Sequence, residues 1–232
     1  MTPTADPAVA AHLAAVQQRI RAAESRFGRE PGSVALLAVS KRQSAGAIRA
    51  AQAAGQLAFG ENYLQEALAK MADLADLPLE WHFIGEIQAN KTRQIAAHFS
   101  WVHGLADAHH AERLSRQRPT GLPPLKACLQ INVSGEATKN GVPPEAAAAL
   151  LAACRQLPGL EVVGLMAMPA PAVGEAAQRQ PFLALRQLRD RLASPDCPLR
   201  ELSMGMSDDL EAAIAEGATL VRIGTAIFGA RS

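Results

Sequence analysis

The sequence predicts an α/β fold, namely a single closed (β/α)8 barrel of the TIM type with an extra helix at its N-terminus. Apolar runs of strand length recur eight times, a helical pattern follows almost every run, and most connections are short. Strands that alternate with helices pair in parallel, and eight of them can close into a barrel. We expect residues 1–232 to form this one domain, and a doubly wound open sheet is the alternative.

The strands are expected from apolar runs that are bounded by turn residues. The first run, Val34 to Val39, shows no alternation and precedes Ser40 and Lys41. Such a run is typical of a strand buried on both faces, as in a parallel sheet covered by helices. The other strands are expected at residues 57–60, 81–85, 101–103, 125–133, 161–168, 200–202 and 219–223, of which 125–133 is the longest.

The helices are expected where apolar residues recur at spacings of three and four. The first covers residues 8–28 and ends at Gly28, and the last begins near Asp208, which forms a capping pair with Glu211. Between them, helices are expected at about residues 45–54, 64–74, 91–97, 108–117, 143–157 and 182–192.

Charge and cysteine content exclude several classes of function. The formal net charge is +1 and no run of Lys or Arg exceeds two residues, which argues against an electrostatic nucleic-acid surface. Cys128, Cys154 and Cys197 are far apart and form no C-x-x-C motif, so we expect reduced thiols rather than disulfides or a zinc site. The sequence contains neither a membrane-spanning apolar run nor a signal-peptide pattern, and we expect a cytoplasmic protein.

Lys41 and two later loops suggest where the chemistry lies. Lys41 follows a buried strand, at the end where α/β folds carry their active sites. The loops at 203–207 and 224–229 follow the last two strands, where barrels frequently bind phosphate, and both offer glycine, a hydroxyl and backbone N–H groups. Each feature alone is better explained by a solvated strand end or an ordinary turn. Together they favour a phosphorylated ligand.

A lysine beside a phosphate site narrows the ligand to one that also carries a carbonyl group. A partly desolvated lysine has a lowered pKa and can form a Schiff base. Pyridoxal 5′-phosphate (PLP) carries an aldehyde and a phosphate, and its ring nitrogen needs a partner. Arg222, two residues before Gly224, is the candidate partner, with a structural ion pair as the alternative. Because arginine cannot accept a proton, it would leave that nitrogen unprotonated and make the cofactor a poor electron sink.

Six ordered motifs carry a specific resemblance: LAVSK at 37–41, FGENYLQE at 59–66, WHFIG at 81–85, GLMAM at 164–168, LSMGMS at 202–207 and VRIGTAIFG at 221–229. From about residue 8 to the C-terminus, the sequence resembles the pyridoxal phosphate homeostasis protein family. The resemblance implies a PLP-binding barrel similar to the N-terminal domain of alanine racemase, in which Lys41 holds the cofactor as an internal aldimine. It further implies phosphate binding by Ser203, Met204, Gly224 and Thr225, a ring-nitrogen contact from Arg222, and a pocket lined by Asn62, His82 and Met166.

Other polar residues receive simpler interpretations. His103, His109 and His110 lack a metal-ligand pattern such as H-E-x-x-H, and we expect them to be solvated residues of loops or helix starts. Lys139 is expected to be a solvated loop charge. No catalytic or metal-binding set is therefore assigned outside the PLP site.

Three functions remain open. The first is a non-catalytic PLP-binding protein, a monomer that buffers the cofactor or delivers it to apo forms of PLP-dependent enzymes. The second is a PLP-dependent amino-acid racemase, which needs a second base that the chain, with no length left for a β-rich domain, is not expected to supply. The third is a sugar-phosphate lyase or isomerase that uses a Lys41 Schiff base without PLP. The resemblance favours the first.

Overall fold

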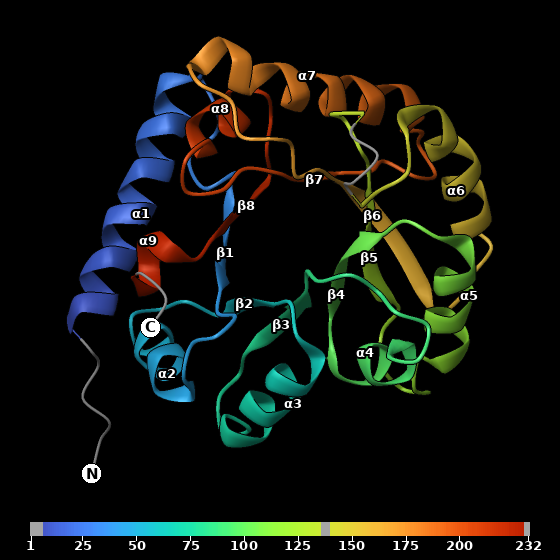
Figure 1. Cartoon of the computed structure of the whole chain (residues 1–232), viewed down its shortest axis with the longest axis horizontal. Helices are drawn as coiled ribbons and strands as arrows, with labels where there is room; N and C mark the ends of the chain where they lie inside the picture. The colour runs from blue at the N-terminus through green and yellow to red at the C-terminus, as the bar shows by residue number, and fades with distance from the viewer. Residues whose placement is uncertain (1–6, 136–139, 230–232) are drawn as a thin grey trace.

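The barrel predicted from the sequence is confirmed. The computed structural model describes residues 7–135 and 140–229, in which eight parallel strands close into a barrel in chain order, surrounded by helices (Figure 1). Lys139 lies outside the described residues. The strands are β1 Ala35–Val39, β2 Ala58–Glu61, β3 Glu80–Phe83, β4 Trp101–Leu105, β5 Leu125–Gln130, β6 Leu160–Met166, β7 Glu201–Ser203 and β8 Leu220–Ile223.

The helices lie around the outside of the strands and follow one another around the barrel in chain order (Figure 1). They are α1 Pro7–Arg26, α2 Ala45–Ala53, α3 Leu64–Asp73, α4 Thr92–His98, α5 Ala108–Gln117, α6 Ala147–Cys154, α7 Glu175–Leu192, α8 Leu210–Ala215 and α9 Thr225–Phe228, with a 3-10 turn at Pro144–Ala146. The extra N-terminal helix α1 packs against α2, α8 and α9. No helix among the described residues has the length and apolar character needed to cross a membrane.

Several boundaries differ from the sequence prediction, and α6, for example, covers residues 147–154 rather than 143–157. Strand β5 ends at Gln130 rather than at residue 133, so the longest described strand is β6. The expected capping pair of Asp208 with Glu211 is absent, because α8 begins after Asp209 and the Glu211 carboxylate accepts a 3.0 Å bond from Arg19 of α1. Tertiary contacts therefore replace the local cap.

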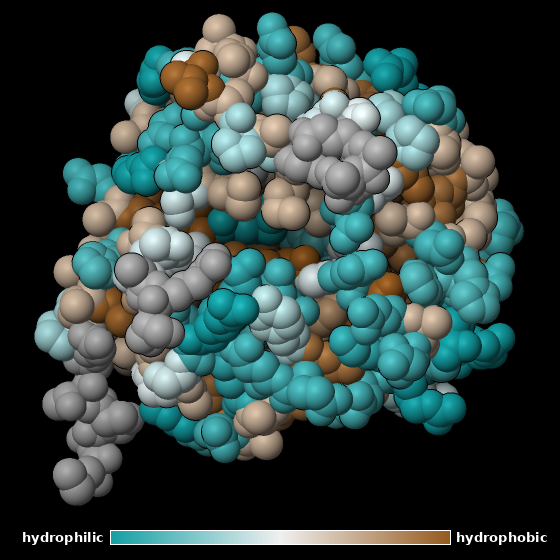
Figure 2. Space-filling model, viewed as in Figure 1, coloured by the Kyte–Doolittle hydropathy of each residue, from teal (hydrophilic) through white to brown (hydrophobic). Residues whose placement is uncertain are grey.

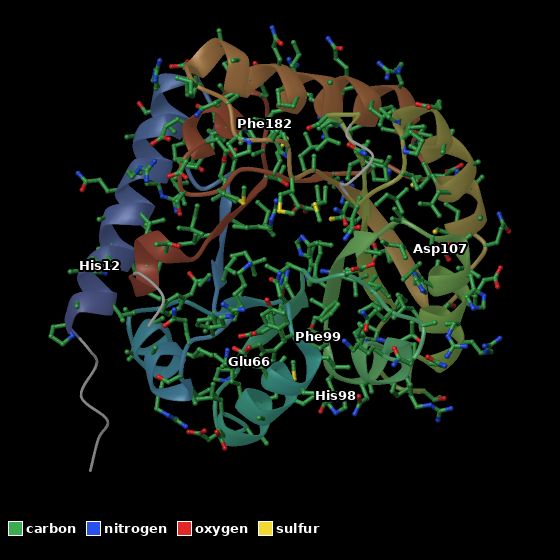
Figure 3. The ribbon with its side chains drawn as sticks, viewed as in Figure 1. His12, Glu66, His98, Phe99, Asp107 and Phe182 are labelled. Atoms are coloured by element: carbon green, nitrogen blue, oxygen red, sulfur yellow. The ribbon has the colours of Figure 1, made fainter. Side chains whose placement is uncertain are left out.

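The outward-facing side chains of the strands form the main apolar core beneath the helices. Successive strand residues point to opposite faces, so Phe59 and Phe83 lie outside the barrel. The rings of Phe83 and Phe99 meet edge to face at 5.3 Å, and Phe182 of α7 is fully buried in the same core (Figure 3). Burying one such aromatic ring stabilises the fold by about 2 kcal/mol.

The inside of the barrel is more polar than the core outside it. His82, Trp101, His103 and Ser203 are among the buried residues of its interior, which also holds a small cluster of Trp101 with Cys128 and Met166. The expectation that His103 is solvated is wrong: β4 continues to Leu105, which places His103 inside the barrel with no exposed surface. A buried histidine needs hydrogen-bond partners, and those of His103 are His82 and Ser203.

Candidate functional site

A cavity of about 750 Å³ opens at the carboxyl ends of the strands. Figure 2 shows a hollow near the middle of the corresponding face, edged by both hydrophilic and hydrophobic residues. This volume is typical of small-molecule sites, and this end of a barrel is where active sites lie. Six of the nine residues predicted to bind the ligand line the cavity: Lys41, Asn62, Met166, Arg222, Gly224 and Thr225.

The other three predicted residues, His82, Ser203 and Met204, are buried and do not line this cavity. The Ser203 hydroxyl bonds to side chains inside the barrel, and the Met204 N–H donates to the Leu220 carbonyl at 3.1 Å. Both groups therefore already have partners within the protein, and their contact with phosphate stays a prediction. Met206 and Ser207, from the same loop, line the cavity instead.

Strands β1 and β8 bring Lys41 and the loop at Gly224 and Thr225 together. They are neighbours in the barrel, with Leu37 opposite Arg222. A Cβ added to Gly224 would lie 3.1 Å from the Val39 carbonyl oxygen, so glycine allows this loop to pass close over the end of β1. Just beyond it, Thr225 and Ala226 begin α9, whose first N–H groups have no acceptor within the helix. This turn therefore presents hydrogen-bond donors to the cavity.

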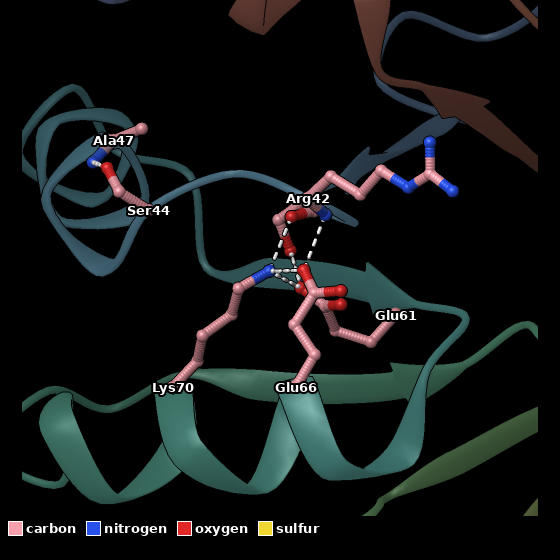
Figure 4. A network of polar contacts seen from close by, with 7 residues as sticks. Arg42, Ser44, Ala47, Glu61, Glu66 and Lys70 are labelled. Atoms are coloured by element: carbon pink, nitrogen blue, oxygen red, sulfur yellow. Dashed lines mark hydrogen bonds and ion pairs between the residues drawn. The ribbon is translucent and has the colours of Figure 1, made fainter. Parts of the chain in front are cut away.

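The turn that carries Lys41 is held from outside the barrel by a cluster of charged side chains (Figure 4). The Lys70 ammonium donates to the Ser40 carbonyl at 2.6 Å, to Glu61 at 2.8 Å and to Glu66 at 2.6 Å. Glu66 also accepts the N–H of Arg42, and Glu61 accepts the Ser40 hydroxyl at 2.6 Å. Burial raises the pKa of the Glu61 carboxyl. The backbone is thus anchored on both sides of Lys41.

Arg42 adopts a backbone conformation that supports this arrangement. Its φ of 62° lies in the left-handed region, which costs a residue other than glycine about 1 kcal/mol. The bond from its N–H to Glu66 compensates for part of that strain. Lys41 itself is partly exposed and lines the cavity.

Arg222 supplies a buried positive charge to the cavity. Its guanidinium donates to the Ser203 carbonyl at 2.7 Å, to the Ser203 hydroxyl at 2.8 Å and to the Ala167 carbonyl at 3.0 Å. Burial lowers its pKa to about 10, while the carboxylate of Asp209 acts in the opposite direction. At neutral pH the group remains charged, although the described residues give it no carboxylate within ion-pair distance.

A hydrogen-bonded chain continues from Arg222 through the barrel. The Ser203 hydroxyl lies 2.8 Å from His103 Nδ1, His103 Nε2 lies 2.9 Å from His82 Nδ1, and His82 Nε2 lies 2.6 Å from the Glu80 carboxylate. Burial lowers the pKa of both histidines, most strongly that of His103. We call these five residues the internal chain. It ends at Glu80, whose side chain is 48% exposed at the amino end of β3.

Two further features of the cavity wall are compatible with a polar, anionic ligand such as PLP. The side-chain oxygen of Asn62 is buried and has no hydrogen-bond partner among the described residues, so the wall contains an acceptor for a ligand donor. Arg19 of α1 lines the cavity and donates to the Ser207 carbonyl at 3.1 Å, which places beside the two loops a guanidinium that is also paired with the Glu211 carboxylate at 2.9 Å. Arg19 lies far from both loops in the chain, and the sequence gives no local signal for its place here.

Comparison with known proteins agrees with this architecture. Residues 11–232 match the family model described as alanine racemase, N-terminal domain, which defines the class of barrel. A pyridoxal phosphate homeostasis protein of Pseudomonas aeruginosa is 60% identical over 96% of both chains, and one of Escherichia coli K12 is 48% identical over 96% of this chain and 97% of its own. The structure of PipY from Synechococcus elongatus with PLP bound is 40% identical, with a TM-score of 0.84, and covers 95% of this chain and 100% of that one. The chain belongs to the pyridoxal phosphate homeostasis protein family.

Proposed function

We propose that this protein binds PLP covalently through Lys41 and serves as a non-catalytic store or carrier of the cofactor. The observation that carries the proposal is the single cavity into which β1 brings Lys41 and β8 brings Arg222 and the Gly224–Thr225 turn. Support also comes from the names of the relatives and from the PLP bound by PipY.

Each group at the cavity has a role in this proposal. The neutral amine of Lys41 adds to the aldehyde carbon of PLP, and a C=N bond forms with loss of one water molecule. Arg222 faces the ring nitrogen, while the Gly224–Thr225 turn, Ser207 and Arg19 surround the phosphate. Asn62 and Met166 line the remaining wall.

The properties of Arg222 favour binding over catalysis. When bound, PLP supplies an electron sink for carbanion chemistry, and that sink is strongest with a protonated ring nitrogen. A guanidinium donates a hydrogen bond and cannot accept a proton, so it leaves this nitrogen unprotonated. We infer a cytoplasmic monomer that buffers PLP or passes it to apo-enzymes, which is tested by the recovery of an apo-enzyme's activity after mixing with the loaded protein.

The covalent bond is tested by visible absorption of the PLP-treated protein before and after borohydride reduction. We expect a Schiff-base band, and after reduction a mass increase confined to the peptide that contains Lys41. Lys41→Ala should abolish both signals. Lys91→Ala, at the start of α4, removes another lysine that does not line the cavity and should leave both unchanged. A wild-type protein without the band refutes the proposal and favours the sugar-phosphate alternative.

A racemase is the second candidate, because the matching family model is that of the alanine racemase N-terminal domain. Its test is the rate of α-proton exchange for several amino acids in deuterated water, compared with free PLP. We expect rates no higher than those of free PLP. A large acceleration that Lys41→Ala removes would establish catalysis instead.

A further inference from the structure

The internal chain crosses the whole barrel, from the cavity to the opposite mouth. Arg222 lines the cavity at one end, and Glu80 is partly exposed to solvent at the other. Between them every group is buried, and the four side-chain links measure 2.6 to 2.9 Å. The Arg222–Ser203 link belongs to the proposed PLP site, whereas His82, which was expected at the pocket, does not line the cavity, and His103 and Glu80 have no role in the proposed function.

The chemistry of the two ends fixes the direction of every hydrogen bond in the chain. A guanidinium can only donate and a carboxylate can only accept. Starting at Glu80, His82 must donate from Nε2, which leaves its Nδ1 as an acceptor for the Nε2–H of His103. His103 Nδ1 then accepts the hydroxyl proton of Ser203, whose oxygen is left to accept from Arg222. With neutral imidazoles, no other arrangement satisfies all four bonds.

The surroundings of the two imidazoles support this assignment. Trp101 stacks on the His82 ring at 5.1 Å with an interplanar angle of 8°, which fixes the plane of that ring. Burial disfavours the charged form of both histidines, and the Lys126 and Arg222 charges act in the same direction. Glu201 opposes this at His82, as does Glu80. The ordinary neutral tautomers are thus sufficient.

We propose that Glu80 is a positioning residue for Arg222 and acts through the internal chain. By accepting at the far end, the carboxylate holds the Ser203 oxygen in its acceptor orientation and keeps the guanidinium at the cavity wall. If the direction reversed, the Ser203 oxygen would have to accept from both His103 and Arg222, and its hydroxyl proton would lose His103 as its acceptor. Reorientation of the hydroxyl group would then weaken the contact with Arg222. The expected effect on PLP binding rests on the proposed function, whereas the hydrogen-bond directions in the internal chain do not.

The first measurement is the protonation of the two histidine rings in the ¹⁵N-labelled full chain without PLP, by long-range ¹H–¹⁵N spectroscopy. We expect His82 and His103 to carry a proton at Nε2 and none at Nδ1. Protonation of either ring at Nδ1, alone or together with Nε2, would overturn the proposed direction.

The second measurement compares Glu80→Ala with Glu161→Ala, which removes an exposed glutamate at the same end of the barrel. We expect Glu80→Ala to mix the histidine tautomers and to accelerate hydrogen exchange of the Arg222 guanidinium about tenfold, the size of one lost hydrogen bond. Glu80→Gln keeps a carbonyl acceptor and should restore both signals, while Glu161→Ala should leave them as in the wild type. Unchanged tautomers and exchange in Glu80→Ala would refute a positioning role.

The third measurement separates this inference from the proposed function. We expect Glu80→Ala to weaken PLP binding several-fold while borohydride still reduces PLP onto Lys41. A wild-type protein that takes up no PLP would refute the proposed function and leave the tautomer results standing. Normal affinity in Glu80→Ala, with the tautomers mixed, would show that Arg222 does not depend on the chain.

Discussion

The two cations that neighbouring strands bring to the cavity, Lys41 and Arg222, are held in opposite ways. Arg222 is anchored by its side chain, inside the barrel, and its described partners are uncharged oxygen atoms. The Lys41 turn is anchored through the backbone on either side of the lysine, and the anchors are charged groups outside the barrel. The contacts of Arg222 fix its charged group, and the contacts beside Lys41 fix the backbone that carries the lysine.

The difference fits what each residue must do in the proposed function. Burial lowers the pKa of Arg222 to about 10, so the guanidinium is still protonated at neutral pH. Fixed oxygen acceptors then hold this charged group in one position. An amine that has to lose a proton and reach an aldehyde must keep a movable side chain. Anchoring the neighbouring peptides directs that side chain without requiring that the amine itself be fixed.

The largest effect is expected when the anchor of the Lys41 turn is removed. Lys70→Met leaves the buried Glu61 carboxyl without its cation, which should lower the free energy of unfolding by about 3 kcal/mol in urea titrations. The rate of PLP attachment, followed by absorbance in stopped flow, should fall about tenfold because the turn is displaced. Arg186→Met, which removes one of two cations from the buried Glu216, is the control and should leave this rate unchanged.

The double variant Glu61→Gln/Lys70→Met separates stability from positioning. It removes the uncompensated carboxylate, so most of the lost stability should return. The rate should remain low, because the Ser40 carbonyl still lacks its donor. A rate that recovers together with stability would contradict the role of the anchor.

At the opposite anchor, Arg222→Met should lower the free energy of unfolding by about 2 kcal/mol. The Ala167 carbonyl loses its guanidinium donor, and the Ser203 carbonyl keeps only the Ala167 N–H. PLP affinity, measured by absorbance titration, should fall at least about tenfold, which is the value of one hydrogen bond to a charged group. Borohydride should still reduce PLP onto Lys41 at saturating PLP. Loss of that product as well would mean that the two anchors are not independent.

The two regions should also respond to pH with opposite signs. The pKa values of His82 and His103 are lowered in the fold, so their stabilising contribution is complete above about pH 6.5 and is lost as the pH falls. The raised pKa of Glu61 acts in reverse, because its contribution is complete below about pH 4.3 and is lost as the pH rises.

Urea unfolding at pH 7.5 and 5.5 tests this difference. We expect the wild type to lose about 1 kcal/mol at the lower pH, because these histidines bind protons in the unfolded chain, whereas burial keeps the rings largely neutral in the fold. His82→Gln/His103→Gln should flatten that dependence, and Glu61→Gln should make it steeper. An unchanged pH dependence in the double histidine variant would show that these rings are not the titrating groups.

The fold and the cavity residues were predictable because their signals are local. Apolar runs and helical spacing placed all eight strands, and the motifs around Lys41 and Arg222 placed both cations at the cavity. The direction of a buried strand and the position of its carboxyl end follow from the order of the elements.

The two anchors were not predictable, because their partners are distant in the sequence. His103 and Ser203 are 100 residues apart, and only closure of the barrel brings them together. Lys70 of α3 meets the Ser40 carbonyl 30 residues away, since Glu61 points outward from β2. A sequence pattern shows that His103 and Lys70 are polar, but it does not show that they are buried.

The smallest predicted effect concerns the strain in the Lys41 turn. At the φ of 62° of Arg42, alanine pays a steric penalty that glycine avoids, although glycine loses more chain entropy on folding. Arg42→Gly should therefore be more stable than Arg42→Ala by about 0.5 kcal/mol in urea unfolding. Both variants remove the contact of the arginine with the Tyr63 ring, so their difference isolates the backbone. If the alanine variant is the more stable one, the Glu66 anchor does not hold Arg42 in a strained conformation, and the turn relaxes without it.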